Sequence, residues 1–459
     1  MKRADFFAKL KLHAAAARRP ALITPEGEWS YRSLIKAVQE RAQRLQDEKC
    51  ALLLPQSDNS AETVITDLAA LWAGVVHVPL PTFFSPAQKA FVEHTLLGSG
   101  SGAPLPIPAD TAKMTFTSGT TGTPKGVCLS AEALLSVAQG IASATDGLGI
   151  ERHMSALPYA VLLENIAGLY APLWRGITCV VLPMQSVGLN GSSQFDPRVL
   201  HEQVERYQAN SLILLPQMLR AWSMSLAAQQ LRAPRSLELV AVGGAAAGVR
   251  LLAQARALGI PAYEGYGLSE GASVQTLNLP GADRPGSVGR PLPHAQVRIG
   301  DDGEVEIRGA LLSGYVQDPD RPVPEWWPTG DLGVLDEDGY LHIQGRKKNV
   351  LITAYGRNVS PEWVETTLKS EPAIAQAVVF GNDQPALSAV LWPSRPEVTH
   401  ALLETAVQAA NAYLPDYARI AHWVRADQAF SADTGLATAN GRPVRERIEA
   451  TYLPHLELV

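Results

Sequence analysis

The feature that most constrains this chain is the stretch from Lys113 to Val127, KMTFTSGTTGTPKGV. Residues 114–117 favour β geometry, so the sequence predicts a strand that ends at Ser118. Four hydroxyl-bearing residues and two glycines follow within positions 118–123. Glycines let backbone N–H groups approach a ligand closely, and hydroxyls add donors, so this loop is suited to binding a polyphosphate.

The lysine after the loop distinguishes it from a Walker A loop. Lys125 follows Pro124 rather than glycine, and the next residue is Gly126 rather than Ser or Thr. A mobile positive charge at the rim still suits a phosphate site. The alternative is an ordinary solvated Ser/Thr/Gly turn. A β run that leads directly into hydroxyls, glycines and one lysine favours the phosphate site.

The length and the order of the predicted elements indicate a multidomain α/β protein. A chain of 459 residues is too long for one ordinary core. Hydrophobic residues make up 46% and charged residues 18%, which is a globular balance. Helices are predicted at 31–46 and 61–73, alternating with strands at 51–55 and 75–78. Such alternation predicts a mainly parallel sheet with helices on its faces.

Charge, cysteines and hydropathy narrow the possible partners and location. The net charge is −6 with no concentration of Lys and Arg, which argues against a nucleic-acid partner. Cys50, Cys128 and Cys179 lack CxxC spacing, so neither a zinc site nor a disulfide framework is indicated. No apolar run reaches membrane-spanning length, and the N-terminus lacks an apolar signal region. We therefore expect no membrane insertion and a cytoplasmic location.

Further motifs follow the loop along the chain. They are Gly243-Gly244, GYGLSE at 265–270, Thr329-Gly330-Asp331, GRKKN at 345–349 and TANGRPVR at 438–445. Residues 267–271 also match G-x-S-x-G, the nucleophile elbow of α/β-hydrolases, with Ser269 as nucleophile. A hydrolase is therefore an alternative, although it leaves the 113–127 loop unexplained.

Taken in order, these segments resemble the signatures of the acyl-adenylate-forming (AMP-binding) superfamily. Its members are acyl- and aryl-CoA synthetases, peptide-synthetase adenylation domains and luciferases. The resemblance implies an α/β fold: a large multi-sheet N-terminal domain with helices on the sheet faces, residues 1–345. A small mobile α+β C-terminal domain, residues 346–459, follows. The interval between about 81 and 113 is abbreviated against the family.

The resemblance also implies roles for individual residues. Lys125, Glu270 and Arg442 are implied to be catalytic, with Glu270 as the Mg²⁺ ligand, and Lys348 lies at the hinge position. The implied nucleotide-binding residues are Thr117, Ser118, Gly119, Thr120, Thr121, Gly122, Gly243, Gly244, Ala245, Tyr266, Gly267, Ser269, Asp331 and Arg346. The implied substrate-pocket residues are Val161, Leu162, Gly244 and Gly267.

Two positions depart from the family pattern. Arg442 stands where relatives carry a lysine that grips the reacting carboxylate and phosphate. Arginine keeps the charge and can donate two parallel hydrogen bonds, but it is not geometrically equivalent to lysine. A non-catalytic nucleotide or acyl binder is therefore a second alternative. Val161 is aliphatic where many relatives have a histidine or an aromatic residue.

The implied activity is that of an acid–thiol ligase. ATP and Mg²⁺ would activate a carboxylic acid to an acyl-adenylate, and the acyl group would pass to coenzyme A or to carrier-protein phosphopantetheine. An acyl carrier protein is therefore a possible partner. Val161, Leu162, Leu163 and the small residues at 243–246 suggest an apolar pocket, which fits a fatty or aromatic acid. Glu164 and Asn165 are polar in this apolar stretch, and backbone partners or a functional role explain them equally well.

Overall fold

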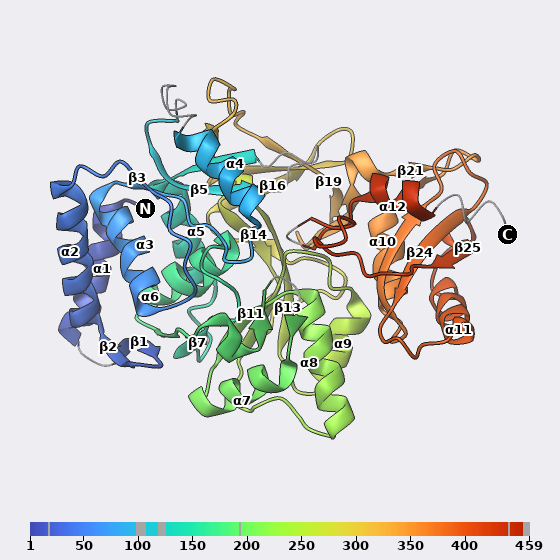
Figure 1. Ribbon diagram of the computed structural model, residues 1–459, viewed down its shortest axis with the longest axis horizontal. Helices are drawn as coiled ribbons and strands as arrows, with labels where there is room; N and C mark the ends of the chain where they lie inside the picture. Colours follow the sequence, from blue (N-terminus) through green and yellow to red (C-terminus); the bar gives the residue numbers. More distant parts are fainter. Residues whose placement is uncertain (17–18, 98–106, 118–124, 192–193, 439–440, 453–459) are drawn as a thin grey trace.

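The computed structural model describes residues 1–16, 19–97, 107–117, 125–191, 194–438 and 441–452. Figure 1 shows a large N-terminal domain and a small C-terminal domain beside it. Both combine helices and strands, so the predicted α/β class is confirmed. The boundary at residue 345 stays a prediction. Within the described residues, no helix combines the length and apolar character needed to span a membrane.

The largest sheet, here called the central sheet, carries the main core of the large domain. In spatial order its strands are β15 (Arg290–Pro291), β14 (Ser273–Leu277), β13 (Ala262–Leu268), β12 (Leu239–Val242), β11 (Ser211–Leu214), β7 (Arg152–Met154), β8 (Thr178–Val180), β1 (Pro20–Thr24) and β2 (Gly27–Ser30). Neighbours from β13 to β1 run parallel, and pairs at both edges run antiparallel. This sheet is therefore mainly parallel; the strands from which a parallel sheet was predicted, at 51–55 and 75–78, pair in parallel in a second sheet.

Helices cover one face of this sheet through an apolar core. They are α7 (Pro197–Tyr207), α8 (Pro216–Gln229) and α9 (Val249–Ala257), drawn in green in Figure 1. Trp222 of α8 is fully buried among Leu212, Leu214 and Val240 of the sheet core. Asp196 caps α7 by accepting from the Arg198 N–H, as the Asp-Pro sequence predicts.

A second sheet, here called the loop sheet, carries the strands that flank the glycine-rich loop. In order they are β18 (Gly314–Tyr315), β6 (Lys125–Ser130), β5 (Thr111–Thr117), β4 (Val76–His77) and β3 (Leu52–Leu53). The strand expected at 51–55 is reduced to the half-buried pair Leu52-Leu53. The neighbouring helices are α1 (Arg3–Ala16), α2 (Tyr31–Asp47), α3 (Ala61–Ala73), α4 (Pro86–Leu97), α5 (Ala131–Ala144) and α6 (Ala171–Arg175).

A third sheet leads to the small domain. It consists of β16 (Ala295–Ile299), β17 (Glu304–Gly309), β19 (Trp327–Leu335) and β20 (Leu341–Arg346). The small domain holds β23 (Ile374–Phe380), β24 (Leu387–Pro393), β25 (Ile420–Arg425), α10 (Pro361–Lys369), α11 (His400–Asn411) and α12 (Arg445–Tyr452). Short pairs are β9 (Leu189–Asn190) with β10 (Gln194–Phe195), and β21 (Leu351–Ile352) with β22 (Asn358–Val359). Leu368, Val379 and Leu403 belong to a separate core, so the α+β prediction is confirmed.

A buried ionic network joins the loop sheet to a π-helix at Glu164–Tyr170. Lys113 of β5 donates to Asp67 of α3 (2.6 Å) and to Asn165 of the π-helix (2.5 Å). Tyr170 also donates to Asp67, and the Nδ1 atom of His77 lies 3.1 Å from that carboxylate. Burial would raise the pKa of Asp67, but the charges of Lys113 and His77 hold it below its usual value. The carboxylate is therefore ionised and paired.

The same π-helix carries a second buried pair. Glu164 is fully buried, and its Oε1 lies 3.1 Å from the Nε2 atom of His153. The other ring nitrogen of His153 lies 2.9 Å from the Ser211 hydroxyl. The principal hydrogen-bond partners of Glu164 and Asn165 are thus side chains. The interpretation that backbone groups satisfy these two residues did not anticipate this. Partners from other elements are invisible in a local sequence window.

Removing the charge of Lys113 tests how much the network around Asp67 contributes to the stability of the fold. Lys113→Met leaves the Asp67 carboxylate buried without its cation, which typically costs about 3–5 kcal/mol of stability. The control is Lys36→Met, which removes an exposed pair with Glu40 at 3.8 Å and costs about 0.3–0.5 kcal/mol. Urea unfolding midpoints at neutral pH measure both losses. Equal small losses in the two variants would contradict a structural role for Lys113.

Candidate active site

The GYGLSE motif forms a hairpin between two strands of the central sheet. Strand β13 ends at Leu268, a short 3₁₀ turn covers Ser269–Gly271, and the chain returns antiparallel in β14. A nucleophile elbow requires a strand followed by a helix. The hydrolase interpretation is therefore wrong in its geometry. The histidine available for it, His342, is paired with Asp336 at 3.1 Å.

Asp331, in the middle of β19, contacts residues of two other strands. The residue is 5% exposed, and its carboxylate accepts a hydrogen bond from the Tyr266 hydroxyl of β13 (2.6 Å). The Nε atom of Arg346, at the end of β20, lies 2.9 Å from the other oxygen. Burial raises the pKa of Asp331, while Arg346 and Tyr266 favour its ionised form. Three residues predicted from separate motifs are thus joined by one hydrogen bond and one ion pair.

Glu270 and Lys125 meet at a tyrosine that the sequence did not single out. The Tyr315 hydroxyl of β18 donates to Glu270 Oε1 at 2.9 Å. The ammonium group of Lys125, which is exposed, lies 5.6 Å from the centre of the Tyr315 ring. Burial and the charge of Glu270 raise the pKa of Tyr315, so its hydroxyl remains a donor. Tyr315 therefore orients one oxygen of Glu270, and the ammonium group of Lys125 lies over the ring of the same tyrosine.

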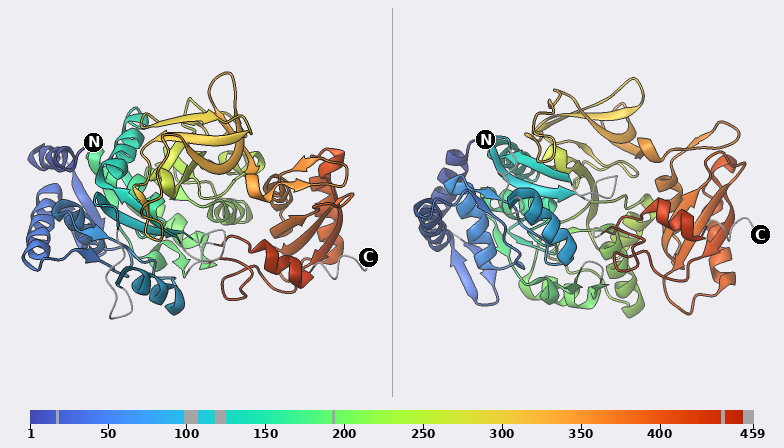
Figure 2. Two further views of the ribbon diagram at one scale, coloured as in Figure 1. Left: turned by 90° about the horizontal axis from the view of Figure 1, so that it is seen from above. Right: turned by 45° about the horizontal axis from the view of Figure 1, so that its top comes forward.

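Arg442 of the small domain lies near Asp331 and Glu270 of the large domain, close enough for their charges to affect its pKa. Its side chain is accessible to solvent, yet enough protein surrounds it that burial lowers its pKa. Arg346 lowers that pKa further, whereas the charges of Asp331 and Glu270 raise it. Both views in Figure 2 show the segment before α12 turned toward the large domain. The structure therefore places Arg442 in electrostatic contact with the predicted site.

The domain junction lies beside these residues. Lys348 is exposed in the 3₁₀ turn Lys347–Asn349 that follows β20. Burial lowers the pKa of Lys348, with contributions from Arg346 and Arg442. Arg250 of α9 pairs with Glu371 of the small domain and lies 5.0 Å from the Tyr413 ring centre. The hinge role of Lys348 stays a prediction.

The glycine loop after β12 forms an open, small-residue surface. Gly244 and Ala245 are exposed, and Gly244 adopts a positive φ of 82°. At Gly267 a Cβ atom would lie 2.1 Å from the carbonyl oxygen of Ser273, so this position excludes any side chain. Beneath the loop, buried Glu264 accepts from the Ala247 N–H at 2.7 Å. A flat base fits such a surface because no side chain extends beyond Cβ.

Part of the predicted phosphate site lies outside the described residues, namely Ser118, Gly119, Thr120, Thr121 and Gly122. Thr117 ends β5 and Lys125 begins β6, so the two ends of this segment are paired antiparallel. Among the described residues, no group of three or more His, Cys, Asp or Glu side chains could hold a metal. Magnesium does not need one, because it is often held by one carboxylate together with substrate phosphates. Glu270 fits that pattern.

An apolar cavity of about 70 Å³, here called the tail cavity, lies behind the glycine loops. Leu163 and Leu277 line it. A Cβ atom on Gly243 would lie 3.8 Å from Leu163, and one on Gly265 would lie 2.9 Å from Leu277. Of the predicted pocket residues, Leu162 is buried in the core and Val161 is half-buried. Neither is among the residues that line this cavity.

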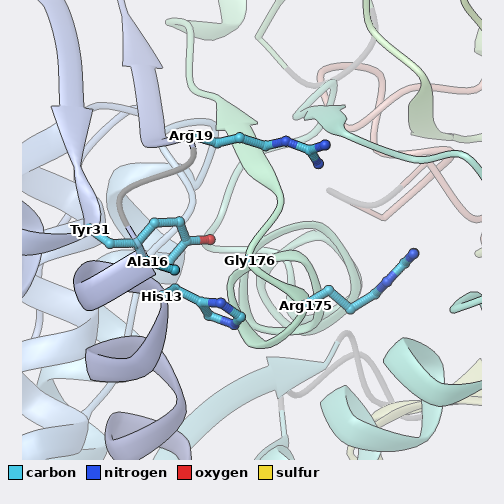
Figure 3. Close-up of a pocket in the computed structure, with 6 residues that line it drawn as sticks. All are labelled: His13, Ala16, Arg19, Tyr31, Arg175 and Gly176. Carbon is cyan, nitrogen blue, oxygen red and sulfur yellow. The ribbon is translucent and has the colours of Figure 1, made fainter.

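A larger hollow of about 280 Å³ lies elsewhere, at the edge near the N-terminal helix. Figure 3 shows its lining residues: His13, Ala16, Arg19, Tyr31, Arg175 and Gly176. The Tyr31 hydroxyl donates to the Ile177 carbonyl (2.8 Å), and Arg19 pairs with Glu151. Tyr31 and Arg19 thus have partners already, and of the residues that line the hollow only Arg175 also lines the tail cavity.

Two family models match most of the chain. The AMP-binding enzyme model matches residues 99–315, and the AMP-binding enzyme C-terminal domain model matches residues 348–458. The chain belongs to the AMP-binding enzyme family. The resemblance to this family and the predicted two-domain α/β fold are thereby confirmed.

Named relatives of this AMP-binding enzyme are CoA ligases. Long-chain-fatty-acid–CoA ligase FadD15 of Mycobacterium bovis is 31% identical over 73% of this chain and 63% of its own length. The 2-succinylbenzoate–CoA ligase of Bacillus velezensis is 29% identical over 60% of this chain and 57% of its own. The matches thus span less than two thirds of these relatives. The Bacillus subtilis o-succinylbenzoate CoA synthetase, solved with its acyl-adenylate intermediate, is 25% identical with a TM-score of 0.76, covering 96% and 97% of the two chains.

Glu264, the third residue of β13, lies beneath the glycine loop and was not predicted from the sequence; a lone acidic residue among the apolar and glycine residues of this strand is the signal that could have found it. Burial raises its pKa from 4.5 to about 7. The protonated side chain of Glu264 is therefore favoured by folding. Its full contribution to the free energy of unfolding is present below the pKa of 4.5 that the unfolded chain has, and this contribution is lost as the pH rises through about 7. Glu264→Gln should abolish this loss, which amounts to about 3 kcal/mol.

Urea midpoints between pH 5 and pH 8 measure the effect. The matched control is Glu26→Gln, which alters an exposed turn residue and should keep the wild-type profile. A Glu264→Gln profile parallel to that of the control would show that Glu264 does not titrate in this range.

Proposed function

We propose that this protein is an ATP-dependent acid–thiol ligase. It activates an apolar monocarboxylic acid as an acyl-adenylate and transfers the acyl group to a thiol. The observation that carries the proposal is that Asp331, Glu270 and Arg442, from three distant motifs, lie close enough for the two carboxylates to favour the charged form of Arg442. The two family models and the CoA-ligase relatives support it.

The nucleotide half of the site would be organised by Asp331. A fixed carboxylate with two oxygens can accept from both ribose hydroxyls, and Tyr266 and Arg346 already hold it in place. The ring of Tyr266 and the small residues at 244–246 would contact the adenine. The Ser269 hydroxyl, in the turn that follows β13, would donate to the α-phosphate.

The first half-reaction joins two anions. The acid carboxylate attacks the α-phosphorus of ATP, a P–O bond forms, and the bond to the pyrophosphate leaving group breaks. Charge neutralisation should therefore dominate catalysis. Lys125 would act on the leaving phosphates, and Arg442 on the carboxylate and the α-phosphate. Glu270 would hold Mg²⁺, which when bound neutralises phosphate charge.

The second half-reaction transfers the acyl group from AMP to a thiol. The thiol sulfur attacks the acyl carbon, and the bond from that carbon to the phosphate oxygen of AMP breaks. The relatives' names favour coenzyme A over carrier-protein phosphopantetheine as the acceptor. A rotation about Lys348 would move Arg442 away and would require the Arg250–Glu371 pair to open.

The acid is proposed to be apolar because the tail cavity is apolar. Leu163, Ala167 and Ala241 line it beside the glycine loop. Its polar lining residues are already hydrogen-bonded, as His153 is to Ser211 and Glu164. Of the acids in the relatives' names, the long-chain fatty acid is an apolar monocarboxylate, whereas 2-succinylbenzoate carries a second carboxylate.

Pyrophosphate release from Mg-ATP tests the proposal with a panel of fatty, benzoic and amino acids. Apolar monocarboxylates should stimulate release, and amino acids should not. Glu270→Gln should weaken the response strongly and shift its magnesium dependence upward, because the metal loses a charged ligand. ATP binding without release for every acid would support the non-catalytic binder instead. An unchanged magnesium profile would remove Glu270 from the site.

Arg442→Ala should depress adenylation far more than thiol transfer from supplied adenylate. Its cation acts on the carboxylate and the α-phosphate only in the first half-reaction. Losing such a contact costs about 10²–10³ in rate, or about 2.7–4 kcal/mol. Arg442→Lys should recover part of the loss, because charge persists while the bidentate fork is gone. Each half-reaction is followed separately. Adenylation by Arg442→Ala at the parent rate would make Arg442 a surface charge.

A further inference from the structure

The tail cavity runs along the parallel strands away from the glycine loop. Ala241, near the carboxyl end of β12, lines its near end beside Gly243. Leu239, at the amino end of the same strand, also lines it, on the order of 7 Å further from the loop. Ile150 and Ile177 pack with Leu239 and close this far end with apolar groups. A tail that enters past Gly243 would therefore extend toward Ile177.

Arg175 stands at the far end, between the tail cavity and the hollow of Figure 3. It lines both spaces, whereas Gly176 lines only the hollow and Ile177 only the cavity. The Ile177 carbonyl also accepts from Tyr31, which lines the hollow. The partition between the two spaces is therefore about one residue thick.

The guanidinium of Arg175 is anchored away from the hollow, as Figure 3 shows for its direction relative to His13 and Tyr31. It donates at 3.3 Å to the Thr145 hydroxyl and to the carbonyls of Asp146 and Leu148, just after α5. A cation held by carbonyls at a helix C-terminus is well placed electrostatically. The side chain is 12% exposed and lines both spaces, so it forms part of the partition between them.

The volumes set a scale for what the cavity holds. Its 70 Å³ is about half of the ~150 Å³ of an apolar cavity that holds benzene. The deepest part of the site therefore accepts a short alkyl segment, not a long chain. The hollow beyond Arg175 would add about 280 Å³.

We propose that Arg175 sets the maximum length of the acid tail. Its stem closes the tail cavity, and removing the stem joins the cavity to the hollow, so that longer tails fit. This inference rests on the proposed function. Arg175 acts as a specificity-determining residue: it contacts the end of the tail and takes no part in the chemistry.

The test measures kcat/KM for pyrophosphate release with straight-chain acids from butanoic to hexadecanoic. Wild-type activity should fall beyond a short or medium length. Arg175→Ala should move the optimum by about two carbons or more, with a gain of roughly tenfold for the longer acid. Arg175→Met keeps the stem and should keep the wild-type profile. Arg19→Ala alters only the hollow and is the matched control.

Two further variants keep the test decisive if Arg175→Ala does not fold. Arg175→Leu shortens the stem with more packing retained and should also favour longer acids. Ala167→Leu narrows the cavity and should favour shorter ones. An unchanged length profile in folded, active Arg175 variants overturns the inference, as does a shift in Arg175→Met equal to that in Arg175→Ala. A wild-type enzyme that activates no acid defeats the proposed function instead.

Discussion

The carboxylate of Asp331 is the point at which the parts of this protein meet. Tyr266 of the central sheet donates a hydrogen bond to it, and Arg346, at the end of β20, forms an ion pair with it. A buried carboxylate stays ionised only where a cation or donors offset its desolvation. Arg346 supplies that cation at the end of β20, next to the predicted domain boundary. On the proposed function, the nucleotide site and the end of β20 therefore depend on the same charge balance.

Arg442 makes this balance sensitive to what is bound. It lies close enough to Arg346 for the two cations to repel, and close enough to Asp331 and Glu270 to be attracted. Added phosphate charge between them would favour the present orientation of the small domain. Loss of pyrophosphate would weaken that attraction and leave the Arg346–Arg442 repulsion less compensated. On the proposed function, departure of the leaving group itself would favour opening of the Arg250–Glu371 contact.

Local physics made much of the fold predictable, and distant contacts made the rest unpredictable. The helices predicted at 31–46 and 61–73 are found at Tyr31–Asp47 and Ala61–Ala73, because their apolar spacing and their flanking residues act locally. The strand expected at 51–55 has only two residues, because only Leu52 and Leu53 pair with β4. Within the site, motif residues were identifiable one by one. Tyr315 was not, because it reaches Glu270 across 45 positions and carries no local signal.

The acid half of the site is less visible in sequence because packing, not charge, shapes it. The π-helix turns Glu164 into the core against His153 while Leu163 and Ala167 line the cavity. Gly168 permits this, since a Cβ atom there would lie 2.2 Å from Glu164 and 2.7 Å from His153. One glycine and one buried pair thus set the position of the cavity wall. On the proposed function, a substitution at Gly168, far from any motif, would displace that wall and change which acid fits while leaving the contacts around Asp331 in place.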